Sequence, residues 1–225
     1  MKKINEIFDN LFKVIPGYYF GFLAFLISFL GAIIALLLSP DYVMWEKSIS
    51  VLGHKAGGIY LRIGLIITGI ISIPFIIYMG RAVRDETNKK YVREVAIIAG
   101  VFSSSCMALS GTFSGVNPFI SWLHGNFALC SWLGGAVAFL SFSILIINNP
   151  KFSRYIAYVG FVIAGIFVFY LIPFFITNFC NYFADLCYDF GRAVYTINPT
   201  FEWAVYFSTV FWYLSGSIYI MYKKI

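Results

Sequence analysis

The chain has 225 residues, of which 60% are hydrophobic and 12% are charged. A soluble domain carries about twice that share of charged residues, so the composition excludes an ordinary soluble protein and favours a membrane protein. The net charge of +6 does not indicate nucleic-acid binding, because the basic residues lie in short segments between long apolar runs.

Residues 1–16 predict an amphipathic helix. The apolar residues recur at helical spacing, and charged residues fill the opposite face. The apolar positions are Ile4, Ile7, Phe8, Leu11, Phe12 and Ile15. The helix should end near Pro16, and we expect it to lie in the membrane interface.

Six apolar runs follow, each long enough for a helix that crosses about 30 Å of hydrocarbon. No linker rich in Pro, Ser or Gly separates them, so a single domain is expected. The sequence therefore predicts an all-α, polytopic bundle of six transmembrane helices. The expected spans are residues 18–39, 58–80, 92–110, 121–147, 154–177 and 201–221.

The basic residues predict the orientation of these spans, because cytoplasmic segments of membrane proteins are enriched in Lys and Arg. If the N-terminus is cytoplasmic, twelve basic residues fall inside and four fall outside. The inside residues are Lys2, Lys3, Lys13, Arg81, Arg84, Lys89, Lys90, Arg93, Lys151, Arg154, Lys223 and Lys224, and the outside residues are Lys47, Lys55, Arg62 and Arg192. An even number of spans then places both termini in the cytoplasm. We expect a multi-pass protein of the cell membrane.

Small residues at four-residue spacing mark where the helices should meet, because they let backbones approach closely in lipid. These residues are Ala24, Ser28 and Ala32 in the first span, Ala96, Gly100, Ser104 and Ala108 in the third, and Gly134 and Ala138 in the fourth. Residues 103–105 are consecutive serines, so the third span is predicted to be the most enclosed helix. Tryptophans at the outer span ends, namely Trp45, Trp122 and Trp203, predict an interfacial aromatic belt.

The outer loop of residues 178–200 shows helical spacing of its apolar residues, which predicts a short second interfacial helix between spans five and six. Gly191 should end this helix. Cys180 and Cys187 are seven residues apart, about 10 Å along a continuous helix, so they can pair only if the chain turns between them. Whether they pair stays open. Cys106 and Cys130 lie inside apolar runs and are expected to be small core residues.

Familiar catalytic motifs are missing from the sequence: no Walker loop, GxGxxG, HExxH or GxSxG pattern occurs. The chain has two histidines, His54 and His124, which excludes a three-histidine zinc site. We expect no metal and no cofactor, and whether the protein is an enzyme stays open.

Ionisable residues gather toward the outer ends of the spans. Arg62 lies about one turn inside the second span, His124 lies at a similar depth in the fourth, and Glu202 opens the sixth. Such groups usually face a cavity or a partner, because exposing them to lipid costs a few kcal/mol. We therefore predict an outward-opening pocket in which Arg62 meets Glu202 or an anionic headgroup.

Within this pocket, His124 is the candidate catalytic residue, since histidine exchanges protons near neutral pH. The candidate substrate-binding residues are Arg62, Glu202 and His54. The alternative is that Arg62 extends to the lipid headgroups and His124 is an interfacial hydrogen-bonding residue.

Two short elements carry a resemblance to a known family. The first outer loop ends in Ile49-Ser50-Val51-Leu52-Gly53-His54, and His124-Gly125 opens the fourth span. With these elements the chain resembles a six-span prokaryotic membrane family of unknown function that is related to the FRAG/DRAM/Sfk superfamily. There, an outer-loop Ser-x-x-Gly-like element and a His at the start of a later span recur. The resemblance implies a six-helix bundle with cytoplasmic termini and a role near membrane lipids, without an assigned reaction.

Three functions are consistent with these features. The first is a lipid-associated role, in which the outward-facing pocket binds a lipid or helps to process one. The second is a small-solute or ion transporter that uses the serine-rich third span, although the spans hold only hydroxyl groups at mid-depth. The third is a non-catalytic subunit of a membrane assembly. The expected partners are membrane lipids, with a second copy of the chain or another membrane protein as alternatives, and no nucleic acid.

Overall fold

The computed structural model describes residues 2–84, 90–115, 117–182 and 184–224. Within these residues the secondary structure is helical and contains no strand. Six stretches are long and apolar enough to cross a membrane, which confirms the predicted all-α bundle of six spans. Lys89, one of the basic residues used for the orientation, lies outside the described residues.

The described helices keep close to the predicted bounds. In chain order they are α1 (Lys2–Val14), α2 (Tyr18–Leu37), α3 (Ile49–Leu52), α4 (Gly58–Ala82), α5 (Lys90–Thr112), α6 (Pro118–Ile147), α7 (Arg154–Tyr182), α8 (Ala184–Tyr195) and α9 (Asn198–Lys223). The helix α6 begins earlier than expected, because the Asn117 side chain accepts a hydrogen bond from the Phe119 amide at 2.9 Å and Pro118 fills the first turn.

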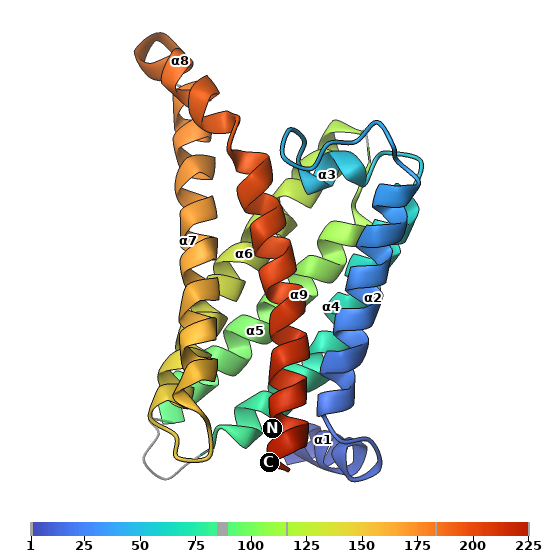
Figure 1. The fold of residues 1–225 in the computed structure, drawn as a ribbon, viewed down its shortest axis with the longest axis vertical. Helices are drawn as coiled ribbons and strands as arrows, with labels where there is room; N and C mark the ends of the chain where they lie inside the picture. Colours follow the sequence, from blue (N-terminus) through green and yellow to red (C-terminus); the bar gives the residue numbers. More distant parts are fainter. Residues whose placement is uncertain (1, 85–89, 116, 183, 225) are drawn as a thin grey trace.

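The spanning helices run side by side between two ends of the molecule (Figure 1). Both termini and α1 lie at one end. We call the opposite end, where α3 and α8 lie, the distal end. At the terminal end, the Asp9 carboxylate of α1 forms a 2.7 Å ion pair with Arg81 of α4. Arg81 also lies over the Phe12 ring, 5.1 Å from its centroid, and the Phe12 ring packs against that of Tyr78 at 5.1 Å. The amphipathic N-terminal helix therefore packs on the bundle through both charged and aromatic contacts.

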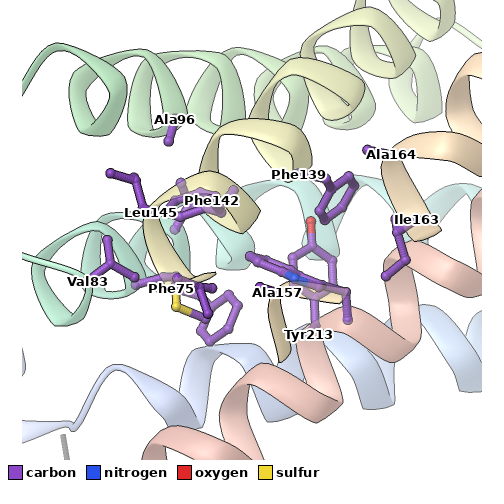
Figure 2. Packing of buried hydrophobic residues seen from close by; sticks show 14 of the residues in the cluster. Phe75, Val83, Ala96, Phe139, Phe142, Leu145, Ala157, Ile163, Ala164 and Tyr213 are labelled. Carbon is purple, nitrogen blue, oxygen red and sulfur yellow. The ribbon is translucent and has the colours of Figure 1, made fainter. Parts of the chain in front are cut away.

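Aromatic residues fill the core between α4, α6, α7 and α9 (Figure 2). The ring of Trp212 lies 5.0 Å from that of Phe139, 5.5 Å from Phe75 and 5.8 Å from Phe142, measured between centroids. The pairs with Phe139 and Phe75 are edge-to-face, and such pairs add about 0.5–1.5 kcal/mol each beyond the area they bury. This packing fixes α9 against α4 and α6.

Small residues bring α4 and α5 into backbone contact. A Cβ atom added at Gly69 of α4 would lie 2.6 Å from the Ser104 carbonyl oxygen and 2.7 Å from the Ala108 amide of α5. Both residues belong to the predicted ladder of the third span, so that ladder packs as expected. The ladder of α2 is also buried, because Ala24, Ser28 and Ala32 are no more than 1% exposed.

The prediction that the third span is the most enclosed is wrong. In the most apolar stretch of each helix, half of the residues of α6 are buried, whereas only a third of the residues of α5 are buried. The small and polar residues of α5 occupy the faces that contact α4 and α6, whereas Ile98 and Phe102 are 68% and 50% exposed on the remaining face. A ladder of small residues therefore identified a packing face, and not a central helix.

The prediction of a tryptophan belt is wrong for Trp203. Trp45 and Trp122 are 67% and 62% exposed, as an interfacial position requires, but Trp203 is only 3% exposed. It is buried because the loop between α2 and α3 folds over the distal end of α9, where the Trp203 indole NH donates a 2.9 Å hydrogen bond to the Tyr42 hydroxyl.

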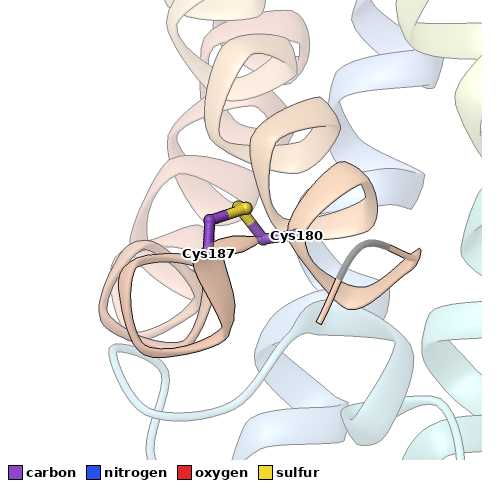
Figure 3. The surroundings of a disulfide bond; sticks show 2 residues. All are labelled: Cys180 and Cys187. Atoms are coloured by element: carbon purple, nitrogen blue, oxygen red, sulfur yellow. A yellow bond between two sulfur atoms is a disulfide. The ribbon is translucent and has the colours of Figure 1, made fainter. Parts of the chain in front are cut away.

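At the distal end, α8 turns back on the end of α7, and a disulfide joins Cys180 to Cys187 (Figure 3). Cys187 has non-helical dihedral angles, with φ −150° and ψ 28°, so the chain makes the turn that pairing requires. Gly191 does not end the helix, which continues to Tyr195. Its role is close packing instead, since a Cβ atom there would lie 2.4 Å from Cys180 Cβ.

Candidate functional site

A central cavity runs from the distal end into the bundle, between all six spanning helices and α3. Its distal part has polar walls, and its deep part has mainly aromatic and aliphatic walls. Hydroxyl side chains, among them Thr68, Ser103 and Ser104, line the part between them. The polar group is Ser50, Arg62, Ser110, Ser114, His124 and Glu202. The deep group is Ile76, Phe139, Phe142, Phe167, Trp212 and Tyr213. The cavity is therefore amphipathic along its length.

The cavity is also deep. Along α4 its walls extend from Arg62 to Ile76, and fourteen helical residues rise about 21 Å. One leaflet of a bilayer has roughly 15 Å of hydrocarbon. A chain-like apolar group could therefore occupy the deep part while a polar group stays among the distal side chains.

Arg62 presents unused hydrogen-bonding capacity to the cavity. Its Nη1 atom donates to the Ser114 carbonyl at 3.2 Å, whereas its Nε atom is buried and has no hydrogen-bond partner among the described residues. A buried donor without a partner carries a cost of about 1–3 kcal/mol, and more when the group is charged. An anionic group in the cavity would satisfy this guanidinium.

Glu202 positions the short helix α3. Its carboxylate is 5% exposed and accepts a 3.2 Å hydrogen bond from the Ile49 amide, the first residue of α3. The next residue of α9, Trp203, contacts the same loop through Tyr42. Two adjacent side chains of α9 thus fix both α3, which carries Ser50, and the loop that leads into it.

Both ring nitrogens of His124 form hydrogen bonds to neighbouring residues. Nδ1 lies 2.9 Å from the Ser110 carbonyl oxygen, and Nε2 lies 3.0 Å from the Ser50 hydroxyl. Because a carbonyl oxygen only accepts, Nδ1 carries the proton, and in the neutral ring Nε2 accepts from Ser50. The ring is thereby oriented by α5 and directed at α3.

A second cavity meets the first at this point. Ser50, His124 and Glu202 line both, and the second cavity continues between α6, α7 and α9 toward Tyr195 of α8. The three side chains therefore lie at a junction that two separate molecules, or two parts of one, can reach.

Three of the four candidate site residues, Arg62, His124 and Glu202, line the same cavity, although they come from three different helices. Arg62 and Glu202 form no ion pair with each other among the described residues, since Ser114 and Ile49 are their partners. His54 is exposed, and it is not among the described residues that line either cavity. The binding and catalytic roles of these residues remain predictions.

Sequence reasoning did not single out Ser50, Ser110 or Tyr42 as functional side chains. Ser50 and His124 are 74 residues apart, and only the folded loop brings them together. The sequence signal that could have drawn attention to Ser50 is its place three residues before Gly53, in the Ser-x-x-Gly-like element that carries the family resemblance.

The serines at mid-depth are bonded to neighbouring helices. The Ser72 hydroxyl donates to Ser104 Oγ at 2.9 Å, and Ser103 Oγ donates to the Ser131 carbonyl at 2.7 Å. The hydroxyl of Ser105 donates to the Val101 carbonyl at 2.9 Å. These hydroxyls thus connect helices or satisfy their own helix, as polar residues do in membrane bundles.

Comparisons with protein-family models, curated proteins and solved structures gave no match to this chain. The resemblance to the FRAG/DRAM/Sfk superfamily therefore stays a prediction.

Proposed function

We propose that the protein binds a membrane lipid in the central cavity, with an anionic headgroup at Arg62 and an acyl chain in the deep part. The observation that carries this proposal is the amphipathic cavity itself, which is polar at its distal end, apolar at its deep end and about 21 Å long in total. A guanidinium binds phosphate and carboxylate groups through paired hydrogen bonds, and Arg62 has donors to spare.

We further propose that the distal end faces outward, away from the cytoplasm, so that the cavity opens to the outer leaflet. The distribution of Lys and Arg supports this orientation. The disulfide between Cys180 and Cys187 supports it independently, because disulfides persist in oxidising compartments and are rare in the cytosol.

The transporter hypothesis is less well supported by the same geometry. Its expected path, the serines of the third span, consists of hydroxyls that already have partners on neighbouring helices or in their own helix. A path for ions or polar solutes would need polar groups free to replace the water shell of the solute. Lipid binding uses the cavity without that requirement.

Lipid retention by the purified protein tests the proposal. The delipidated protein is incubated with dioleoyl phosphatidic acid or with dioleoylglycerol, which has the same acyl chains and no phosphate, and bound lipid is counted by native mass spectrometry. We expect phosphatidic acid to be retained preferentially, and Arg62→Gln to weaken its retention about 10-fold or more, because a hydrogen bond to a charged group contributes about 1.5–3 kcal/mol.

Arg192→Gln is the matched control, since Arg192 is an exposed arginine of α8. It should retain phosphatidic acid as the unsubstituted protein does. Equal retention of both lipids by the unsubstituted protein and by Arg62→Gln would contradict the proposal.

A further inference from the structure

The hydrogen bonds of His124 give it the geometry of a general base. The Ser110 carbonyl holds the proton on Nδ1, which leaves the Nε2 lone pair directed at the Ser50 hydroxyl 3.0 Å away. A nucleophile, a base within hydrogen-bonding reach and a third group that orients the base are the features that mark activated serines in hydrolases. Here the third group is a backbone carbonyl.

We propose that Ser50 is a nucleophile activated by His124, and that the protein hydrolyses an acyl ester of the lipid in the central cavity. This inference rests on the proposed function, because the lipid supplies the ester. Ser50 lies at the polar end of the cavity, where the ester group of a lipid would lie between the headgroup and the apolar chains.

The structure holds Ser50 firmly enough for this role. Its short helix α3 is bonded to α9 through the Ile49 amide and Glu202, and the preceding loop is bonded through Tyr42 to Trp203. Fixed positioning of a nucleophile lowers the barrier because less entropy is lost during the reaction. Glu202 acts here as a positioning residue.

The two cavities provide two separate routes to Ser50 and His124. The central cavity accommodates the acyl chain, and the second cavity, which also reaches Ser50 and His124, gives water or the released alcohol a separate path. A hydrolase that forms a covalent intermediate needs such access, since water must reach the acyl group while its chain is still bound.

The steps balance with water as the only co-reactant. Ser50 Oγ attacks the ester carbonyl carbon as His124 Nε2 takes the hydroxyl proton. The tetrahedral intermediate collapses, the bond to the alcohol oxygen breaks, and the alcohol leaves with the proton from His124. Water then attacks the acyl-serine, gives a proton to His124, and releases the carboxylic acid as Ser50 regains that proton.

A serine-directed probe tests this assignment. The full chain in detergent is treated with an alkyl fluorophosphonate, and mass spectrometry locates the modified residue. We expect modification at Ser50, its loss in Ser50→Ala, and a rate about 100-fold lower in His124→Gln, which is the lower range for removing a general base. Ser48→Ala should react at the normal rate, because the Ser48 hydroxyl caps no amide of α3.

The thermal midpoint of each variant shows whether it is folded. If Ser50→Ala does not fold, Ser50→Cys replaces it, and iodoacetamide should alkylate the new thiol rapidly, at a rate that His124→Gln lowers. A Ser50–His124 bond that serves only to tie α3 to α6 would leave the unsubstituted protein unmodified by the fluorophosphonate, and this result would overturn the inference.

Measuring lipid retention on the same protein distinguishes failure of the hydrolysis inference from failure of the lipid-binding proposal. Retention of phosphatidic acid without modification of Ser50 would overturn only the hydrolytic step. Modification of Ser50 without retention of any lipid would overturn the lipid-binding function and keep Ser50 and His124 as a reactive pair.

Discussion

At the scale of single residues, the distal end depends on a few buried hydrogen bonds. The Tyr42 hydroxyl lies 2.6 Å from the Lys47 carbonyl and 2.8 Å from the Ser48 carbonyl, to which it donates, and it accepts from Trp203. Burial raises the pKa of Tyr42, so the hydroxyl stays protonated and keeps donating. One side chain therefore shapes the loop that leads into α3.

Tyr42→Phe should destabilise the protein by about 1–3 kcal/mol, because it leaves the Trp203 indole NH buried without an acceptor. The measurement is the thermal midpoint in detergent. Tyr91→Phe is the control, since Tyr91 is 75% exposed and should tolerate the change. Equal midpoints for both variants would show that the Tyr42 contacts contribute no stability.

The residues of the site were predictable in part. Arg62, His124 and Glu202 could be found from sequence, because an ionisable side chain near the end of an apolar run is costly unless it faces a cavity. Their actual partners could not be found in this way. Arg62 bonds to a carbonyl of the loop after α5, and Glu202 bonds to the first amide of α3. The positions of both groups depend on how the distal segments fold.

At the scale of elements, the contact between α4 and α5 sets how closely the bundle can pack. Gly69→Ala should lower stability by about 1–3 kcal/mol, because the new methyl group meets backbone atoms of Ser104 and Ala108 that cannot rotate away. Gly165→Ala in α7 is the matched control, since no described atom outside its own helical turns lies within 4 Å of the added Cβ. Thermal midpoints in detergent compare the two.

The same midpoints can contradict this account of packing. If Gly69→Ala and Gly165→Ala unfold at the same temperature, α4 and α5 are not in the close backbone contact described above. Gly165→Ala is expected to be neutral or slightly stabilising, because alanine favours the helix by up to about 1 kcal/mol over glycine.

The elements themselves were predictable because their signal is local. In lipid, an apolar run long enough to cross the membrane forms a helix, because a helix satisfies the backbone groups within the run itself. Features that depend on distant contacts were not predictable. The burial of Trp203 requires the loop that contains Tyr42, and the helical course of residues beyond Gly191 depends on how α8 packs against Cys180.

At the scale of the whole molecule, the proposed orientation can be tested from outside the cell. In a background with Cys106 and Cys130 replaced by Ala, a cysteine at Lys47 should react with a membrane-impermeant maleimide on intact cells, and a cysteine at Lys223 should react only after lysis. Lys47 lies in the distal loop and Lys223 ends α9 at the terminal end. Labelling of the cysteine at position 223 on intact cells would show that the terminal end faces outward and that the proposed orientation is wrong.

The central claim is that one lipid occupies the amphipathic cavity, and a cryo-electron microscopy map of the protein in nanodiscs that contain phosphatidic acid tests it most directly. We predict elongated density inside the bundle, with the phosphate at the Arg62 guanidinium and an acyl chain reaching the rings of Phe139 and Trp212. Ordered lipid confined to the outer surface of the helices, with the space between Arg62 and Trp212 closed by side chains, would contradict the account.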